Sequence, residues 1–395
     1  MRFTAATAPS TRPLLRAQNI LLRIISFSFK MCQNQPMRIS QKREKTMKEL
    51  FNLRKLGLAA AAASAMFAAS VTAAEEYTIG VSWRHFQEER WKIDEAGILS
   101  ILKSGGHTYV SADAQADPVK QVTDIESLIA SGVDALIVLA QDSQAVLPAL
   151  ERAHEEGIPV VAYDAPIDDP NALFVSFDNV AVGRLMAEAM LEEQPTGNWA
   201  LIEGDSAHSI VQVFREGQMQ ALQPKIDAGE IKVVAQQNIV NWAPDAAQAA
   251  VDQILTANAN AIDAVLAMND GMSGGAAAAL EAQGLDNVAL SGQDGSTAAL
   301  NRIAKGQQTV TIWKNATELG RAAASAAVSM AGGVAPGDVA GSTTAPTISG
   351  AEQPAILLEP FAITRGNLNL VVDADWISKD ALCNGVGDGG PTPCN

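Results

Sequence analysis

The sequence is poor in the residues that most often carry metal binding and redox chemistry. Its 395 residues contain four histidines and three cysteines. No His/Cys cluster has the spacing of metal ligands, so we expect no metal site. Cys32 lies far upstream, whereas Cys383 and Cys394 lie close together in a Gly/Pro-rich end of the chain. In an exported protein this pair is a candidate disulfide that links the C-terminal end locally.

Signatures of catalysis are also scarce. No histidine is spaced with a serine and an acid in a way that favours nucleophilic catalysis. The glycines of "GMSGG", residues 271–275, form neither a dinucleotide nor a nucleoside-triphosphate motif, and we interpret them as allowing close helix–sheet packing. We therefore expect a protein that is not an enzyme and that needs no cofactor.

Basic residues are rare beyond the N-terminal segment. Residues 1–74 hold 12 Lys/Arg and two Asp/Glu, which leaves 16 Lys/Arg against 42 Asp/Glu and a net charge near −26 for the rest. Such acidity disfavours nucleic acid and anionic membrane surfaces as partners.

Long apolar runs are absent except near the N-terminus. From Met47 onward a basic "MKELFNLRK" precedes an apolar "LGLAAAAASAMFAAS" and the small residues of "VTAAEE". This layout is typical of a secretory signal peptide, here residues 47–74, and the apolar run is too short for a permanent membrane span. Residues 1–46 are then an upstream segment that belongs to a start placed too early. We expect a mature, periplasmic chain that begins near Ala74 or Glu75.

The rest of the sequence alternates between apolar runs of strand length and amphipathic stretches of helix length. "YTIGVSW", "ERWKIDEAGILSILKSGG" and "HTYVSAD" begin the series, and a second set of similar size follows "FVSFDN", residues 174–179. This alternation predicts an α/β protein with two doubly wound, Rossmann-like parallel sheets. Residues after Trp376 are expected to be poorly packed.

Acidic residues stand at the ends of three predicted strands. "PVVAYD" ends in Asp164, "DAVLAMND" in Asp270 and "VALSGQD" in Asp294. A lone Asp at such a place more simply caps the next segment. Ligands of doubly wound sheets, however, bind at the carboxyl ends of strands, where Lys314 and Trp83 are also predicted. Carboxylates accept hydrogen bonds from hydroxyls and Asn269 can donate or accept, so the set favours a sugar or polyol.

Tryptophans show a similar placement. Trp83, Trp91, Trp242 and Trp313 all lie near predicted strand ends or helix starts, where flat aromatic faces can cover a sugar ring. Arg90 precedes Trp91 and either reaches hydroxyls or faces solvent. The histidines His85 and His208 lie in predicted strand-to-helix loops, so either can touch a ligand, but for each we favour solvent exposure.

Several of these stretches together resemble the periplasmic sugar-binding proteins of ABC transporters with the type I fold, most closely the xylose-binding subgroup. The resemblance runs from about Tyr77 to about Glu359 and rests on "ERW", "VVAYD", "SFDNVAVG", "FREGQM", "LTANANAIDAVLAMND", "GGAAAALEAQGL", "SGQD" and "QTVTIWK". It implies a monomer whose two lobes close on one monosaccharide and then dock on a membrane permease. The ligand contacts that it implies are Arg90, Trp91, Asp164, Trp242, Asn269, Asp294 and Lys314.

The resemblance also implies a three-segment hinge, near residues 176–179, 312–315 and 357–361. The N-terminal lobe would comprise residues 75–178 and 315–360, and the C-terminal lobe residues 179–314 and 361–376. A tail would follow at residues 377–395.

The sequence departs from the family pattern at three positions. Ala165 replaces an arginine, and Ser209 and Ile210 replace a pair of asparagines. These losses imply a ligand with fewer or differently placed hydroxyls than xylose. Further candidate contacts are Trp83, Arg84, His85, His208 and Trp313.

An alternative function on the same fold is a periplasmic receptor that passes a bound sugar or signal molecule to a chemoreceptor or sensor kinase. A sugar-responsive repressor would need an N-terminal helix-turn-helix, and an export signal stands there instead.

Overall fold

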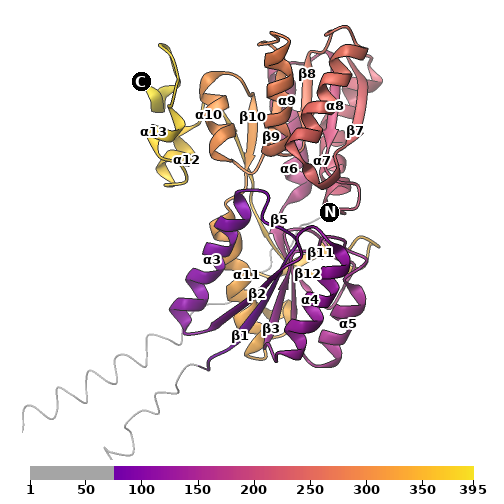
Figure 1. Cartoon of the computed structure of the whole chain (residues 1–395), viewed down its shortest axis with the longest axis vertical. Helices are drawn as coiled ribbons and strands as arrows, with labels where there is room; N and C mark the ends of the chain where they lie inside the picture. Colours follow the sequence, from indigo (N-terminus) through magenta and orange to yellow (C-terminus); the bar gives the residue numbers. More distant parts are fainter. Residues whose placement is uncertain (1–74) are drawn as a thin grey trace, which may run out of the picture. The chain divides into compact units, whose positions relative to one another are not determined.

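A computed structural model describes residues 75–395 of the chain (Figure 1). The upstream segment 1–46 and the signal peptide 47–74 inferred above lie outside the described residues. The described part contains two mostly parallel sheets with helices on their faces, as the alternating sequence pattern predicts. No helix within residues 75–395 is both long enough and apolar enough to cross a membrane.

The first sheet has seven strands in the order β11-β12-β5-β4-β3-β1-β2. All neighbours are parallel except the edge pair β11 and β12. The strands are β1 (Thr78–Trp83), β2 (Thr108–Asp113), β3 (Ala135–Val138), β4 (Val160–Tyr163), β5 (Leu173–Phe177), β11 (Thr343–Pro346) and β12 (Glu352–Leu358).

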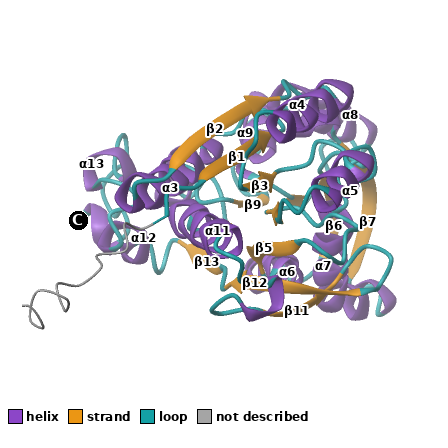
Figure 2. Ribbon diagram, turned by 90° about the horizontal axis from the view of Figure 1, so that it is seen from below, coloured by secondary structure: helices purple, strands orange, loops and turns teal. Residues whose placement is uncertain are grey.

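Helices cover both faces of this sheet because its central strands are apolar on both sides. Ile137 of β3 packs in the cluster that includes α3 (Arg90–Gly105) and α11 (Ala316–Ala331). Its neighbours Leu136 and Val138 point the other way, into the cluster with α4 (Pro118–Ala130) and α5 (Leu147–Glu155). Figure 1 and Figure 2 show α3 beside α11. A continuous apolar run is the pattern expected of a parallel strand buried on two faces.

The second sheet has six strands in the order β13-β10-β9-β8-β6-β7, again parallel except for the edge pair β13 and β10. Its strands are β6 (Gly197–Glu203), β7 (Ile231–Asn238), β8 (Ala264–Ala267), β9 (Ala289–Gln293), β10 (Val310–Trp313) and β13 (Phe361–Thr364). Its helices are α6 (Asn179–Glu193), α7 (Ile210–Asp227), α8 (Pro244–Ala257), α9 (Asp270–Ala282) and α10 (Thr297–Lys305). Short 3-10 turns occur at η1 (Val240–Trp242) and η2 (Pro336–Asp338).

Glycines bring the helices of each pair into close contact. A Cβ on Gly275 of α9 would lie 2.0 Å from the carbonyl oxygen of Pro244 in α8. A Cβ on Gly183 of α6 would lie 2.0 Å from the carbonyl oxygen of Phe214 in α7. Gly275 of the "GMSGG" segment thus serves helix–helix contact, and the helix–sheet packing expected from the sequence is wrong for this residue.

The chain passes between the two sheets three times. It leaves β5 and enters α6 through Asp178, leaves β10 and enters α11 through residues 314–315, and leaves β12 and enters β13 through residues 359–360. Each half is therefore built from segments that are distant in the sequence.

The C-terminal residues are packed, contrary to the expectation from their composition. Ile377 and Leu382 are buried in a cluster with Leu300 and Ile303 of α10. A disulfide joins Cys383 to Cys394, whose Cα atoms are 5.3 Å apart. The segment folds into α12 (Asn369–Asp373), α13 (Lys379–Leu382) and η3 (Thr392–Cys394).

Candidate ligand-binding site

A small polar cavity of about 20 Å³ lies where strand ends of both sheets converge. All seven residues that the family resemblance implies as ligand contacts line it, together with five others. The lining residues are Arg84, Glu88, Arg90, Trp91, Asp164, Ile210, Phe214, Trp242, Asn269, Gln293, Asp294 and Lys314. A cavity of this volume has room for roughly one water molecule.

Arg90 joins acids from both sheets. It is the first residue of α3 and is 5% exposed. Its Nη2 donates to Oδ1 of Asp164 at 2.9 Å, and its Nη1 donates to Oδ1 of Asp294 at 3.0 Å. Asp164 follows β4 of the first sheet, whereas Asp294 follows β9 of the second. The Arg90 guanidinium also lies over the Trp91 ring, with its Cζ 4.3 Å from the ring centroid, which is a cation–π contact.

Lys314 supplies a second buried cation. Its Nζ lies 3.4 Å from Oδ1 of Asp164 and 3.8 Å from Oδ1 of Asp294. The rings of Phe177 and Phe214 lie near it, with centroids 5.7 and 5.5 Å from Nζ. Burial alone would raise the pKa of Asp164, but the charges of Arg90 and Lys314 outweigh burial and lower that pKa to about 2. The carboxylate is therefore ionised and can accept hydrogen bonds at neutral pH.

The chain turns sharply at the site. Asp164 has φ of 60°, Asp294 has φ of 101° and Trp242 has φ of 56°. These values lie in a region that non-glycine residues rarely adopt, and such residues concentrate at binding sites. The turns take the chain out of the strand direction directly at the sheet edge.

Two further buried acids, Asp94 and Asp270, lie next to residues of the site. Asp94 accepts hydrogen bonds from Arg90 and from the Tyr163 hydroxyl, and burial raises its pKa to about 6. Asp270 begins α9 and does not line the small cavity. It accepts from the Thr311 hydroxyl at 2.8 Å and from the Ser296 amide at 2.8 Å. Of the three strand-end acids, Asp164 and Asp294 line the small cavity and Asp270 does not.

The pKa of Asp270 is raised to about 7. Burial is the main cause, and the negative charge of Asp294 adds to it. Arg302 opposes the shift only partly, and its own pKa is lowered by burial.

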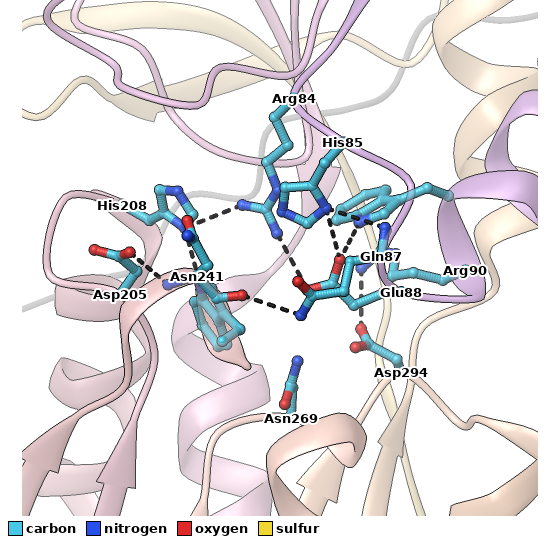
Figure 3. Close-up of polar contacts among 12 residues, drawn as sticks. Arg84, His85, Gln87, Glu88, Arg90, Asp205, His208, Asn241, Asn269 and Asp294 are labelled. Atoms are coloured by element: carbon cyan, nitrogen blue, oxygen red, sulfur yellow. Dashed lines mark hydrogen bonds and ion pairs between the residues drawn. The ribbon is translucent and has the colours of Figure 1, made fainter. Parts of the chain in front are cut away.

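Arg84, His85, Glu88 and His208 form a second polar group beside Arg90 (Figure 3). Nη1 of Arg84 lies 3.1 Å from Nδ1 of His208, and the indole of Trp242 donates to the same Nδ1 at 2.6 Å. Because Nδ1 accepts these bonds, the imidazole proton of His208 is on Nε2. Burial, with a smaller effect of the Arg84 charge, lowers the pKa of His208 to about 2 and that of His85 to about 3.

The two histidines are buried, at 3% and 6% exposure, so the solvent-exposed alternative from the sequence is wrong for both. His85 does not line the small cavity, but it lies 3.3 Å from Glu88, which does. Trp91 also donates to Glu88, from its indole to Oε2 at 2.6 Å.

Two candidate tryptophans are placed elsewhere. Trp83 is fully buried in the first sheet's core and donates to the Tyr109 hydroxyl at 3.0 Å. Trp313 packs against Phe361 and Trp376. Neither lines the small cavity.

Sequence reasoning missed three lining residues, Glu88, Phe214 and Gln293. Phe214 and Gln293 lie inside "FREGQM" and "SGQD", two of the stretches that carry the family resemblance, and Glu88 directly precedes "ERW". No group of three or more His, Cys, Asp or Glu side chains within residues 75–395 could hold a metal ion.

Taken together, two doubly wound sheets and a polar cavity at their converging strand ends are typical of a ligand-binding protein. A family model described as "Periplasmic binding protein domain" matches residues 79–334. The chain belongs to this family, and within it to the sugar- and polyol-binding proteins of ABC transporters, which are not enzymes.

Individual relatives agree. The chain is 37% identical over 310 residues to the D-xylose-binding periplasmic protein of Escherichia coli K12, covering 78% of this chain and 93% of that one. It is 36% identical over 304 residues to the protein of the same name from Haemophilus influenzae, covering 76% and 90%. A solved carbohydrate-transporter binding protein from Chloroflexus aurantiacus, in complex with D-glucose, matches with a TM-score of 0.72 and 26% identity, covering 78% and 98%.

Proposed function

We propose that this protein captures a pentose-like monosaccharide or a related polyol in the small cavity. After export to the periplasm it delivers this ligand to an ABC permease. The single observation that carries the proposal is the meeting of Asp164 and Asp294 on Arg90, because these acids come from strand ends of different sheets. A hydroxylated ligand that bonds to both acids links the two halves of the protein.

Capture requires movement. A cavity of about 20 Å³ is far smaller than a monosaccharide, so the surrounding side chains must separate for a ligand to enter. The three chain crossings, at residues 178, 314–315 and 359–360, are the places where backbone rotation can open the cavity. A ligand that contacts both halves then favours the closed arrangement.

D-xylose itself is a poor fit to three positions. Ala165 is buried and carries no hydrogen-bonding side chain. Ser209 donates its hydroxyl to the carbonyl of Pro166 at 2.8 Å, and Ile210 adds an apolar wall to the cavity. A guanidinium and two amides would each add directional hydrogen bonds that Ala165, Ser209 and Ile210 do not make toward the ligand.

Isothermal titration of the mature protein with D-xylose, xylitol, D-ribose and D-glucose tests the proposal. We expect one of these ligands to bind at micromolar concentration or tighter, and D-xylose to bind more weakly than low micromolar. Tight D-xylose binding would contradict the inference that Ala165, Ser209 and Ile210 make D-xylose a poor fit. Binding of no sugar or polyol would overturn the proposed function itself.

A further inference from the structure

We propose that Glu88 and Gln293 are specificity-determining ligand contacts, each accepting a hydrogen bond from a ligand hydroxyl. This inference rests on the proposed function and extends it to two residues that the family resemblance does not supply. The juxtaposition that supports it is a buried acceptor oxygen without a partner in the described part of the chain on each of two residues, from different parts of the fold, that line the same cavity.

Glu88 uses only one of its two oxygens within the protein. Oε2 accepts from the Trp91 indole at 2.6 Å. Oε1 is buried and has no hydrogen-bond partner among residues 75–395. The nearest cation is Arg84, whose Nη2 lies 3.8 Å from Oε1, which is longer than a hydrogen bond. The side chain is 12% exposed and lies beside Arg84, His85 and Arg90 (Figure 3).

Gln293 provides the matching feature on the second sheet. It is the last residue of β9, directly before Asp294, and it is 3% exposed. Its Oε1 is also buried and without a hydrogen-bond partner in the described part of the chain.

Buried acceptors are nearly always paired in folded proteins, so an unpaired one needs an explanation. Two of the donors that line the cavity are already engaged, because Arg90 bonds to Asp164 and Asp294 and Trp91 bonds to Glu88 itself. A hydroxyl can supply the missing proton, and a polyol carries several at fixed spacing. Glu88 and Gln293 therefore select ligands that present hydroxyl donors toward both walls.

A single bound water is the competing explanation, since the cavity volume suffices for about one. A water would donate hydrogen bonds to the two oxygens, and neither residue would then discriminate between ligands. The two cases differ in how they respond to removal of a ligand hydroxyl.

The test compares Glu88→Gln and Gln293→Met with the unaltered mature protein, using whichever of D-xylose, xylitol, D-ribose and D-glucose binds it most tightly. Glu88→Gln keeps an oxygen for Trp91 but removes the charge, and Gln293→Met keeps the size but removes the oxygen. We expect affinity to fall about 10-fold and 10- to 100-fold respectively. The matched controls Glu281→Gln and Gln307→Met make the same changes at exposed positions and should bind as the unaltered protein does.

Monodeoxy analogues of that ligand complete the test. One analogue should bind the unaltered protein more weakly than the parent ligand does, but should bind Glu88→Gln about as tightly as the parent ligand does. A different analogue should show the same pattern with Gln293→Met. The inference would be overturned if the variants are folded, as judged by circular dichroism, and rank the affinities of the analogues as the unaltered protein does. The proposed function would remain intact. Failure of the unaltered protein to bind any of the four ligands would instead reject the proposed function, and this inference with it.

Discussion

At the scale of single residues, the acids Asp164 and Asp294 line the cavity and are the ligand contacts that we propose. Both are ion-paired with Arg90, so their charge is compensated in the folded protein. A ligand hydroxyl gains a stronger hydrogen bond from a carboxylate than from a neutral oxygen.

Replacing either acid by its amide is therefore expected to weaken ligand binding strongly. Asp164→Asn and Asp294→Asn should each lower affinity by about 30- to 1000-fold, which corresponds to roughly 2–4 kcal/mol. Calorimetric titration measures the loss, and circular dichroism checks that the fold is retained. If both variants bind as tightly as the unaltered protein, the ligand site lies elsewhere.

Asp270 makes stability depend on pH. Its native pKa of about 7 lies above the ordinary value near 4, so the folded protein keeps a proton that the unfolded chain releases between those two values. The stability that comes from this group is complete below pH 4 and is lost as the pH rises through 7.

Relative to Asp270→Asn, the unaltered protein should therefore lose on the order of 3 kcal/mol of unfolding free energy between pH 4 and pH 8. Urea unfolding at several pH values measures this difference. The exposed Asp286→Asn is the control and should show no such relative change. A difference that is constant with pH would show that Asp270 is already ionised in the acidic range.

At the scale of elements, the adjacent glycines of α9 offer a matched comparison. A Cβ at Gly275 would lie 2.0 Å from a main-chain oxygen of α8, whereas a Cβ at Gly274 would lie 3.4 Å from the flexible end of Arg302. Gly275→Ala should destabilise the protein by about 1–3 kcal/mol because the helices must move apart.

Gly274→Ala should instead be neutral or should stabilise the protein by up to about 1 kcal/mol, since alanine is the better helix former. Thermal unfolding of the two variants distinguishes them. Equal behaviour would mean that α8 and α9 are not in close contact at Gly275.

The elements themselves were predictable, whereas some of their contacts were not. The two doubly wound sheets follow from the alternation of apolar and amphipathic segments, and the structure confirms them. The antiparallel edge strands β11 and β13 carry no distinct signal in a local pattern. Position at a strand end was a sound guide for Asp164 but not for Trp83, because side-chain direction alternates along a strand and is not visible in the position alone.

At the scale of the whole molecule, composition misjudged the C-terminal segment. Its glycines and prolines predicted loose packing, yet Leu382 is fully buried and the disulfide closes a loop with a sequence separation of 11. A local pattern cannot show that α10 presents an apolar surface for these residues.

The same geometry predicts that the disulfide affects stability more than binding. Replacing both Cys383 and Cys394 by serine should lower the unfolding free energy by up to about 3 kcal/mol, because the unfolded chain is then less constrained. No residue from 377–395 lines the small cavity, so ligand affinity should change less than twofold. Urea unfolding and calorimetric titration give the two numbers, and a tenfold loss of affinity would reveal a connection between the C-terminal segment and the cavity.

The positive φ angles at Asp164 and Asp294 have a consequence for any attempt to redesign this protein as a biosensor. Aspartate, asparagine and glycine tolerate such backbone angles, while branched and bulky side chains do not. A mutant library at these two sites would mostly return strained proteins. New selectivity is more accessible at Ile210, which lines the small cavity and has no such backbone angle, so a polar side chain there can face the ligand.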